Sequence, residues 1–412
     1  MRSAAAVLAG LGAAAALAGA HGADTLAAAH GADTLAGARR ADMTAMFART
    51  SYAPGSTAEL RIAAPGGRLT VQPISALGGR ASSVFHDTAV GPARSIRWRG
   101  GTHAIKVRIG AWPSGVYFFR VRSAHDGQVV APVVVRPARL GTARVAVVVP
   151  TFTWQAYNRR GGDSWYVCSC VRTVDLTRPH LHSGVPYNFA QYDRGFFDWL
   201  AKEHERVDVL TDEDLDAVAS GERLRRAYRM VVFEGHGEYV TSHIYDVTQR
   251  YRDLGGHLAF LSANDFFRRV VVRGGSMTLI GEWRALGRPE AALIGSQYID
   301  WFRNRYRNRQ YVVVGARRLP WLFAGTRLRN RRRIAGHFGI EIDGLAPSSP
   351  PGTIVAAEIP DIFPHETAQM TYYTMRAGAE VFNAGTIDFG GGAEIHDVSS
   401  LLRNLWRHMG PR

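Results

Sequence analysis

The sequence predicts two folded domains, a small all-β sandwich followed by an α/β domain with a doubly wound parallel sheet. Between residues 43 and 137, short segments alternate apolar and polar side chains, which indicates strands with one buried face. Beyond residue 143, continuous apolar runs alternate with amphipathic segments, a pattern typical of parallel strands covered on both faces by helices.

The first 42 residues are expected to lie outside both domains. Arg2 precedes an alanine-rich apolar run from Ala4 to Ala18, which is the layout of a secretory signal peptide. We therefore predict a signal peptide over residues 1–23, a flexible leader over residues 24–42, and a secreted or periplasmic protein. The run is too short for a membrane span, so no stable membrane insertion is expected. The alternative is a misassigned start codon followed by an alanine-rich leader.

The sandwich is predicted over residues 43–137. The stretch HAIKVRIG at residues 103–110 alternates apolar and basic side chains, and Asp126-Gly127 is a hairpin turn signal between two apolar runs. Several such strands in a short span favour an immunoglobulin-like sandwich. No catalytic group stands out in this part of the chain.

The α/β domain is predicted over residues 143–412. RVAVVVP at residues 144–150 and MVVFEG at residues 230–235 are continuous apolar runs, as expected of buried parallel strands. Helices are predicted over FFDWLAKE, over residues 240–253, and over VSSLLRNLWRHM at residues 398–409. The order of these segments predicts a flavodoxin- or glutamine-amidotransferase-like parallel sheet.

The charge of +15 comes almost entirely from arginine. No helix-turn-helix, zinc-finger or RNA-binding motif accompanies these arginines, so a solvated basic surface is favoured over nucleic-acid binding. The two cysteines, Cys168 and Cys170, are expected to be ordinary residues, with a metal-binding or redox pair as the alternative. The sequence also lacks the HExxH, phosphate-loop and nucleophile-elbow motifs.

The stretch GHGEY at residues 235–239 follows a predicted strand, and ligands of doubly wound sheets bind beyond such strand ends. In an extended segment His236 and Glu238 point the same way, so both would reach one small cation. A hydrogen-bonded His–Glu pair without metal is the alternative. Gly235 and Gly237 would allow a tight turn beside a ligand.

Aromatic residues crowd the loop PTFTWQAYNRRGGDSWY, which follows the first parallel strand. Packing is the usual role of such residues, but this loop would face the same crevice as GHGEY. A tyrosine oxygen beside a carboxylate is a hard anionic donor set, which favours a ferric ion over metals that prefer soft ligands. A cation would be needed to lower the phenol pKa from about 10.

Several separated motifs in this order resemble the carboxy-terminal domain of the large (beta) subunit of dimethylformamidase. They are VVVPTFTWQAYNRRGGDSWY, GHGEY, WLFAGT, GIEIDGL, MTYYT and EVFNAGTID, and the resemblance covers about residues 143–412. It implies an iron-dependent amidase that hydrolyses small linear amides, with two tyrosinates and a carboxylate as iron ligands and a histidine close by.

Matched residue by residue, the resemblance places Glu238, His236 and Tyr157 in these roles, with Tyr166 as the second tyrosine and Tyr187 and Tyr192 as alternatives. Asn264 is a candidate donor to the developing oxyanion, with capping of a following helix as the alternative. A small second subunit or a homo-oligomer is a possible partner. The competing functions are a secreted binding or scaffold protein without turnover, and a hydrolase that uses zinc or no metal.

Overall fold

The structure, a computed structural model, describes residues 43–76, 88–125, 127–162, 164–167, 170–302, 309–363 and 366–411. The predicted signal peptide and leader lie outside these residues. Cys168 also lies outside them, but Cys170 is disulfide-bonded, so the expectation that the cysteines are ordinary residues is wrong. Within the described part of the chain, no helix has the length and apolar character needed to cross a membrane.

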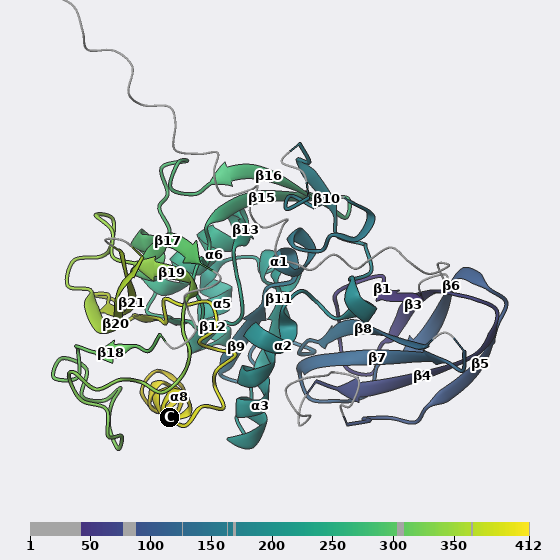
Figure 1. Cartoon of the computed structure of the whole chain (residues 1–412), viewed down its shortest axis with the longest axis horizontal. Helices are drawn as coiled ribbons and strands as arrows, with labels where there is room; N and C mark the ends of the chain where they lie inside the picture. Colours follow the sequence, from purple (N-terminus) through teal and green to yellow (C-terminus); the bar gives the residue numbers. More distant parts are fainter. Residues whose placement is uncertain are drawn as a thin grey trace, which may run out of the picture.

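The N-terminal part forms two sheets that enclose a common hydrophobic core (Figure 1). The first sheet has the order β1-β3-β6, with β1 (Thr44–Phe47), β3 (Thr57–Ala64) and β6 (Gly101–Arg108). The second has the order β2-β8-β7-β4-β5, with β2 (Ser51–Tyr52), β8 (Gly127–Val135), β7 (Gly115–Ser123), β4 (Gly67–Ser75) and β5 (Arg94–Trp98). Alternating burial along β3 explains the alternating sequence pattern. The immunoglobulin-like character of this sandwich stays a prediction.

The largest sheet has eight strands in the order β11-β9-β12-β14-β22-β21-β20-β18. The first five are parallel, and the remaining pairings are antiparallel. The bounds are β11 (Asp208–Thr211), β9 (Val145–Val149), β12 (Met230–Phe233), β14 (His257–Phe260), β22 (Glu380–Asn383), β21 (Glu366–Thr374), β20 (Ile354–Phe363) and β18 (Val312–Val313).

Two smaller sheets flank the eight-stranded sheet. One has the order β10-β16-β15-β13, with β10 (Thr173–Asp175), β16 (Ser276–Glu282), β15 (Arg268–Arg273) and β13 (Tyr239–Thr241). The other pairs β17 (Gln297–Phe302) with β19 (Ile340–Gly344). The helices are α1 (Thr151–Ala156), α2 (Phe189–Tyr192), α3 (Arg194–Lys202), α4 (Asp212–Asp216), α5 (Gly221–Ala227), α6 (Ser242–Asp253), α7 (Ala291–Ile294) and α8 (His396–Met409), with 3-10 turns η3 (Arg160–Gly162) and η4 (His182–Gly184).

The predicted doubly wound parallel fold is therefore wrong. Among the described residues, strand accounts for 37% and helix for 19%, and several sheets are mixed or antiparallel. The error has a physical cause. The apolar runs along β20 and β22 identify strands but do not specify their direction, and β21 pairs antiparallel with both. Strands β15, β16, β17 and β19 form additional small sheets instead of joining the large one.

Both faces of the parallel strands are buried, as their continuous apolar sequences require. Along β9, Val145, Val147 and Val149 face one core, which includes residues of α3 and α8. Ala146 and Val148 face the other core, which includes residues of α5 and α6. This packing fixes the carboxyl ends of the parallel strands, where the loops that carry the predicted site residues begin.

Candidate metal and catalytic site

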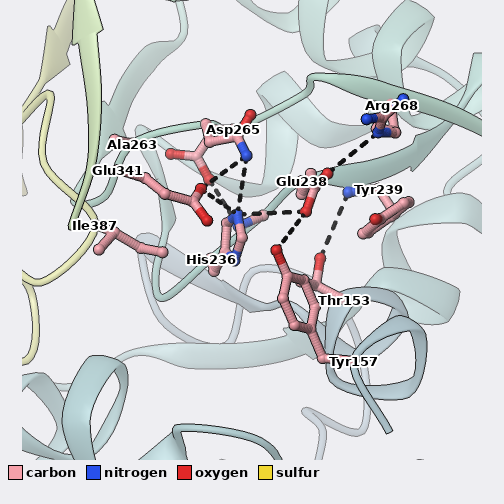
Figure 2. A network of polar contacts seen from close by, with 12 residues as sticks. Thr153, Tyr157, His236, Glu238, Tyr239, Ala263, Asp265, Arg268, Glu341 and Ile387 are labelled. Atoms are coloured by element: carbon pink, nitrogen blue, oxygen red, sulfur yellow. Dashed lines mark hydrogen bonds and ion pairs between the residues drawn. The ribbon is translucent and has the colours of Figure 1, made fainter. Parts of the chain in front are cut away.

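The predicted site residues converge at the carboxyl edge of the parallel strands, although they come from distant parts of the chain. Tyr157 ends α1 after β9, and His236 and Glu238 lie between β12 and β13. The hydroxyls of Tyr157 and Tyr166 both donate to Oε2 of Glu238 at 3.0 Å, and His236 Nε2 lies 3.5 Å from the same oxygen. Figure 2 shows Tyr157 and His236 directed toward this carboxylate.

The loop from β12 to β13 takes its shape from two glycines. Gly235 has a φ of 71°, and a Cβ there would lie 2.4 Å from Oδ1 of Asp193. A Cβ on Gly237 would lie 2.6 Å from Oδ1 of Asp265, which accepts a hydrogen bond from the Gly237 backbone N–H at 2.8 Å. Any larger residue would displace these carboxyl groups, so the glycines allow His236 and Glu238 to face the same side.

Stacked rings fix the position of the two phenols. The Tyr157 and Tyr166 rings are 4.0 Å apart and nearly parallel, and the ring of Tyr187 stacks on Tyr157 at 4.9 Å. The Tyr166 hydroxyl also lies 2.6 Å from the hydroxyl of Tyr239. Of the three tyrosines considered for the second phenol, Tyr166 is therefore the one that donates to Glu238, while Tyr192 is buried at the end of α2.

Three further residues complete the site, and sequence reasoning did not assign them a role. Glu341 in β19 places Oε2 at 3.0 Å from His236 Nε2. Arg268 at the start of β15 lies 3.4 Å from Oε1 of Glu238, and Tyr239 contacts Tyr166. Glu341 belongs to the motif GIEIDGL, and Tyr239 directly follows Glu238, so both carried a sequence signal. We call Tyr157, Tyr166, His236, Glu238 and Glu341 the polar cluster.

Asn264 joins the polar cluster from the loop after β14. Its side-chain N–H groups donate to Oε2 of Glu341 at 2.7 Å and lie 3.3 Å from His236 Nε2. The residue has a left-handed backbone, with a φ of 58°, a conformation that asparagine tolerates better than most residues. The next element in the chain is strand β15, so capping of a following helix is ruled out. These contacts make Asn264 a residue that positions Glu341 and His236.

Burial and mutual repulsion control the ionisation of the cluster. Burial, followed by the charge of Glu238, raises the pKa of Tyr157 and of Tyr166 well above 10. Burial also raises the pKa of Glu238, against the opposing effect of His236 and Arg268. For His236, burial lowers the pKa, but the carboxylates of Glu341 and Glu238 outweigh it and raise the pKa to about 9. Without a cation, the cluster therefore holds neutral phenols beside a protonated imidazole.

The donor atoms fit a hard cation. Within the described residues, no three His, Cys, Asp or Glu side chains gather as metal ligands, so a metal in the cluster would depend on phenol oxygens. Two phenols approach one carboxylate oxygen at 3.0 Å, a spacing compatible with ligands that share one ion at about 2.0–2.2 Å. Oxygen donors of this kind suit a ferric ion better than a metal that prefers sulfur. The metal-binding role of these residues stays a prediction.

Comparisons with solved structures give only weak likenesses. A superoxide reductase (neelaredoxin) from Ignicoccus hospitalis is 8% identical, covers 23% of this chain and 80% of its own, and has a TM-score of 0.16. The mmIFT52 N-terminal domain is 12% identical, covers 52% of this chain and 87% of its own, and has a TM-score of 0.31. Scores this low carry no argument about fold or function. The search of curated protein sequences gives no match.

A family model gives a clear result. The model described as N,N-dimethylformamidase beta subunit-like, C-terminal, matches residues 80–400. The match confirms the resemblance seen in the separated motifs. It also begins inside the sandwich, upstream of the boundary expected at residue 143. With well over half of its length matched, the chain belongs to the N,N-dimethylformamidase beta subunit-like, C-terminal family.

Proposed function

We propose that this protein hydrolyses the C–N bond of small linear amides at the polar cluster, with iron as its metal. The observation that carries the proposal is the convergence of two phenols and an imidazole on one oxygen of Glu238. The family description supports an amide as the substrate. Tyr157, Tyr166 and Glu238 would hold a ferric ion through oxygen atoms.

The metal and the protein residues would make different contributions to amide hydrolysis. When bound, a ferric ion supplies Lewis acidity toward the amide carbonyl. Arg268 lies against Oε1 of Glu238, while Oε2 faces the phenols, so the arginine orients the carboxylate. The ring of Tyr187 stacks on that of Tyr157 and so helps to hold the Tyr157 phenol in place.

Glu341 and His236 are placed to move protons. The Glu341 side chain is 14% exposed, whereas that of Glu238 is 3% exposed, so Glu341 is the carboxylate that a water molecule reaches more readily. In hydrolysis, a water oxygen bonds to the carbonyl carbon and Glu341 accepts a proton from this water. The C–N electron pair leaves on nitrogen, which receives a proton from His236. The proton on Glu341 then passes to His236 across their 3.0 Å contact, and both groups are restored.

The test uses full-length protein expressed natively, because refolding without metal would remove the readout. We expect iron in the purified protein, a visible tyrosinate-to-iron charge-transfer band, and release of amine from a panel of short amides. Glu238→Ala should abolish iron, band and activity together. A variant that retains iron would exclude Glu238 as a ligand. Zinc in the wild-type protein would support a hydrolase of another class, and metal-free, inactive protein would support a binding role.

We further propose that the protein is exported and works with a second chain. The apolar run after Arg2 supports export, and the family description refers to a beta subunit. Mass spectrometry of the mature protein from its native host should find a new N-terminus near residues 20–23. An intact Met1 would contradict export, and a purified chain that is fully active alone would contradict the need for a second subunit.

A further inference from the structure

A cleft of about 750 Å³ lies where the sandwich meets the rest of the chain. Its walls come from residues 47–51 between β1 and β2, residues 136–140 after β8, residues 213–223 around α4, and the adjoining ends of β10 and β15. None of the five residues of the polar cluster lines it. We call it the interdomain cleft. Pockets at such junctions commonly bind small molecules, and this volume is in the usual range of about 300–1,000 Å³.

The walls of the interdomain cleft are held rigidly. The Ser51 hydroxyl donates to Oδ1 of Asp214 at 2.8 Å across the junction, and Arg136 pairs with the same oxygen at 3.5 Å. The Val209 backbone N–H donates to the Ser114 hydroxyl at 2.7 Å. Side chains of β7 and β8 also share a hydrophobic core with α2 and α3. The cleft is therefore part of the folded structure and does not need a ligand to form.

The interdomain cleft carries an excess of unpaired positive charge. Its two carboxylates have partners, since Asp214 binds Ser51 and Arg136, and Oε2 of Glu213 accepts from the Thr151 hydroxyl at 2.8 Å. Arg139 and Arg223 also line the cleft and are exposed. Their guanidinium groups make no hydrogen bond or ion pair with another described residue. Free guanidinium groups bind carboxylates through two parallel hydrogen bonds.

Apolar side chains line the wall next to these arginines. Leu140, Leu176 and Val272 face the cleft and pack on the core beneath it while remaining partly accessible. A ligand that satisfies both surfaces has an anionic head and a short apolar body. We propose that the interdomain cleft binds a small organic carboxylate of this kind, with its head on Arg139 and Arg223 and its apolar body on the leucine and valine wall.

Calorimetric titration of the full-length protein with hexanoate tests the proposal. We expect saturable binding of one hexanoate that weakens at least about tenfold, or about 1.4 kcal/mol, in the double variant Arg139→Gln/Arg223→Gln. The matched control is Arg317→Gln/Arg318→Gln, which removes the same charge from two exposed arginines that do not line the cleft and should bind hexanoate like the wild type. Both pairs are exposed, so neither change should disturb folding.

Titrations with acetate and with 1-hexanol test the anionic head and the apolar body of the proposed ligand one at a time. Acetate lacks the apolar body and 1-hexanol lacks the charge, so both should bind more weakly than hexanoate. Absence of saturable hexanoate binding, or an equal loss in the two double variants, would overturn the proposal. Equal affinity for hexanoate and either comparison molecule would overturn the assigned ligand class.

Discussion

Replacing Tyr166 by phenylalanine removes one hydroxyl from the polar cluster and leaves the stacked ring in place. This hydroxyl donates to Glu238 at 3.0 Å and pairs with the Tyr239 hydroxyl at 2.6 Å. A hydrogen bond to a charged group contributes about 1.5–3 kcal/mol and a neutral one about 0.5–1.5 kcal/mol, so removing both would lower the free energy of unfolding by about 2–4.5 kcal/mol. Because Tyr166 is half-buried, water replaces part of the loss, and we expect about 2–3 kcal/mol.

The stability measurement is urea unfolding of the iron-free protein, and the functional measurement is iron content with the visible band after native expression. Tyr166→Phe should lose most of its iron and its band as well as stability. The control is Tyr117→Phe in the sandwich, where the hydroxyl donates to the Pro113 carbonyl at 2.9 Å. This change should cost about 0.5–1.5 kcal/mol and leave iron unaffected. The reasoning is refuted if Tyr166→Phe keeps wild-type iron and colour, or if it destabilises no more than the control.

Three further predictions follow from the same contacts. Glu341→Gln removes the carboxylate that favours the imidazolium, so the pKa of His236 should fall below about 9 in an NMR titration of iron-free protein; an unchanged pKa would contradict this. Asn264→Gly keeps the left-handed backbone but loses the contacts to Glu341 and His236. Amide turnover should therefore fall about 10–100-fold while the protein retains its iron. Loss of iron would contradict a role limited to positioning Glu341 and His236. Burial raises the pKa of Glu234 well above 4.5 in the folded protein. The preference of the folded state for the protonated carboxyl therefore stabilises the fold fully below pH about 4, and this stabilisation is lost as the pH rises through the folded pKa. In urea unfolding, the free energy of unfolding of Glu234→Gln relative to wild type should be higher at pH 8 than at pH 5, and an equal difference at both pH values would disprove it.

Local patterns in the sequence predicted several elements correctly. The continuous apolar run at residues 145–149 is strand β9, and the amphipathic segment at the end of the chain is helix α8. The glycines around His236 indicated a tight turn, and the structure shows why a side chain cannot be added there. These features depend on hydrophobic periodicity and on backbone conformations that nearby residues determine.

The direction of the strands was not predictable in the same way. An apolar run such as the one in β20 has the same composition whether its neighbour is parallel or antiparallel, and this ambiguity produced the wrong fold class. The small sheet of β17 and β19 was missed for a related reason, since its two strands are joined through residues 303–339 and pair only in the folded chain. Glu341 reaches the site through this pairing.

The sequence by itself pointed to Tyr157, Tyr166, His236 and Glu238 as site residues, because GHGEY and the aromatic loop each follow a recognisable strand end and together resemble one family. Only the tertiary structure decided how those groups meet. Arg268 and Glu341 contact Glu238 and His236 because β15 and β19 pack beside the parallel strands. Contacts between residues that are far apart in the sequence depend on sheet pairing and packing, which no local pattern encodes.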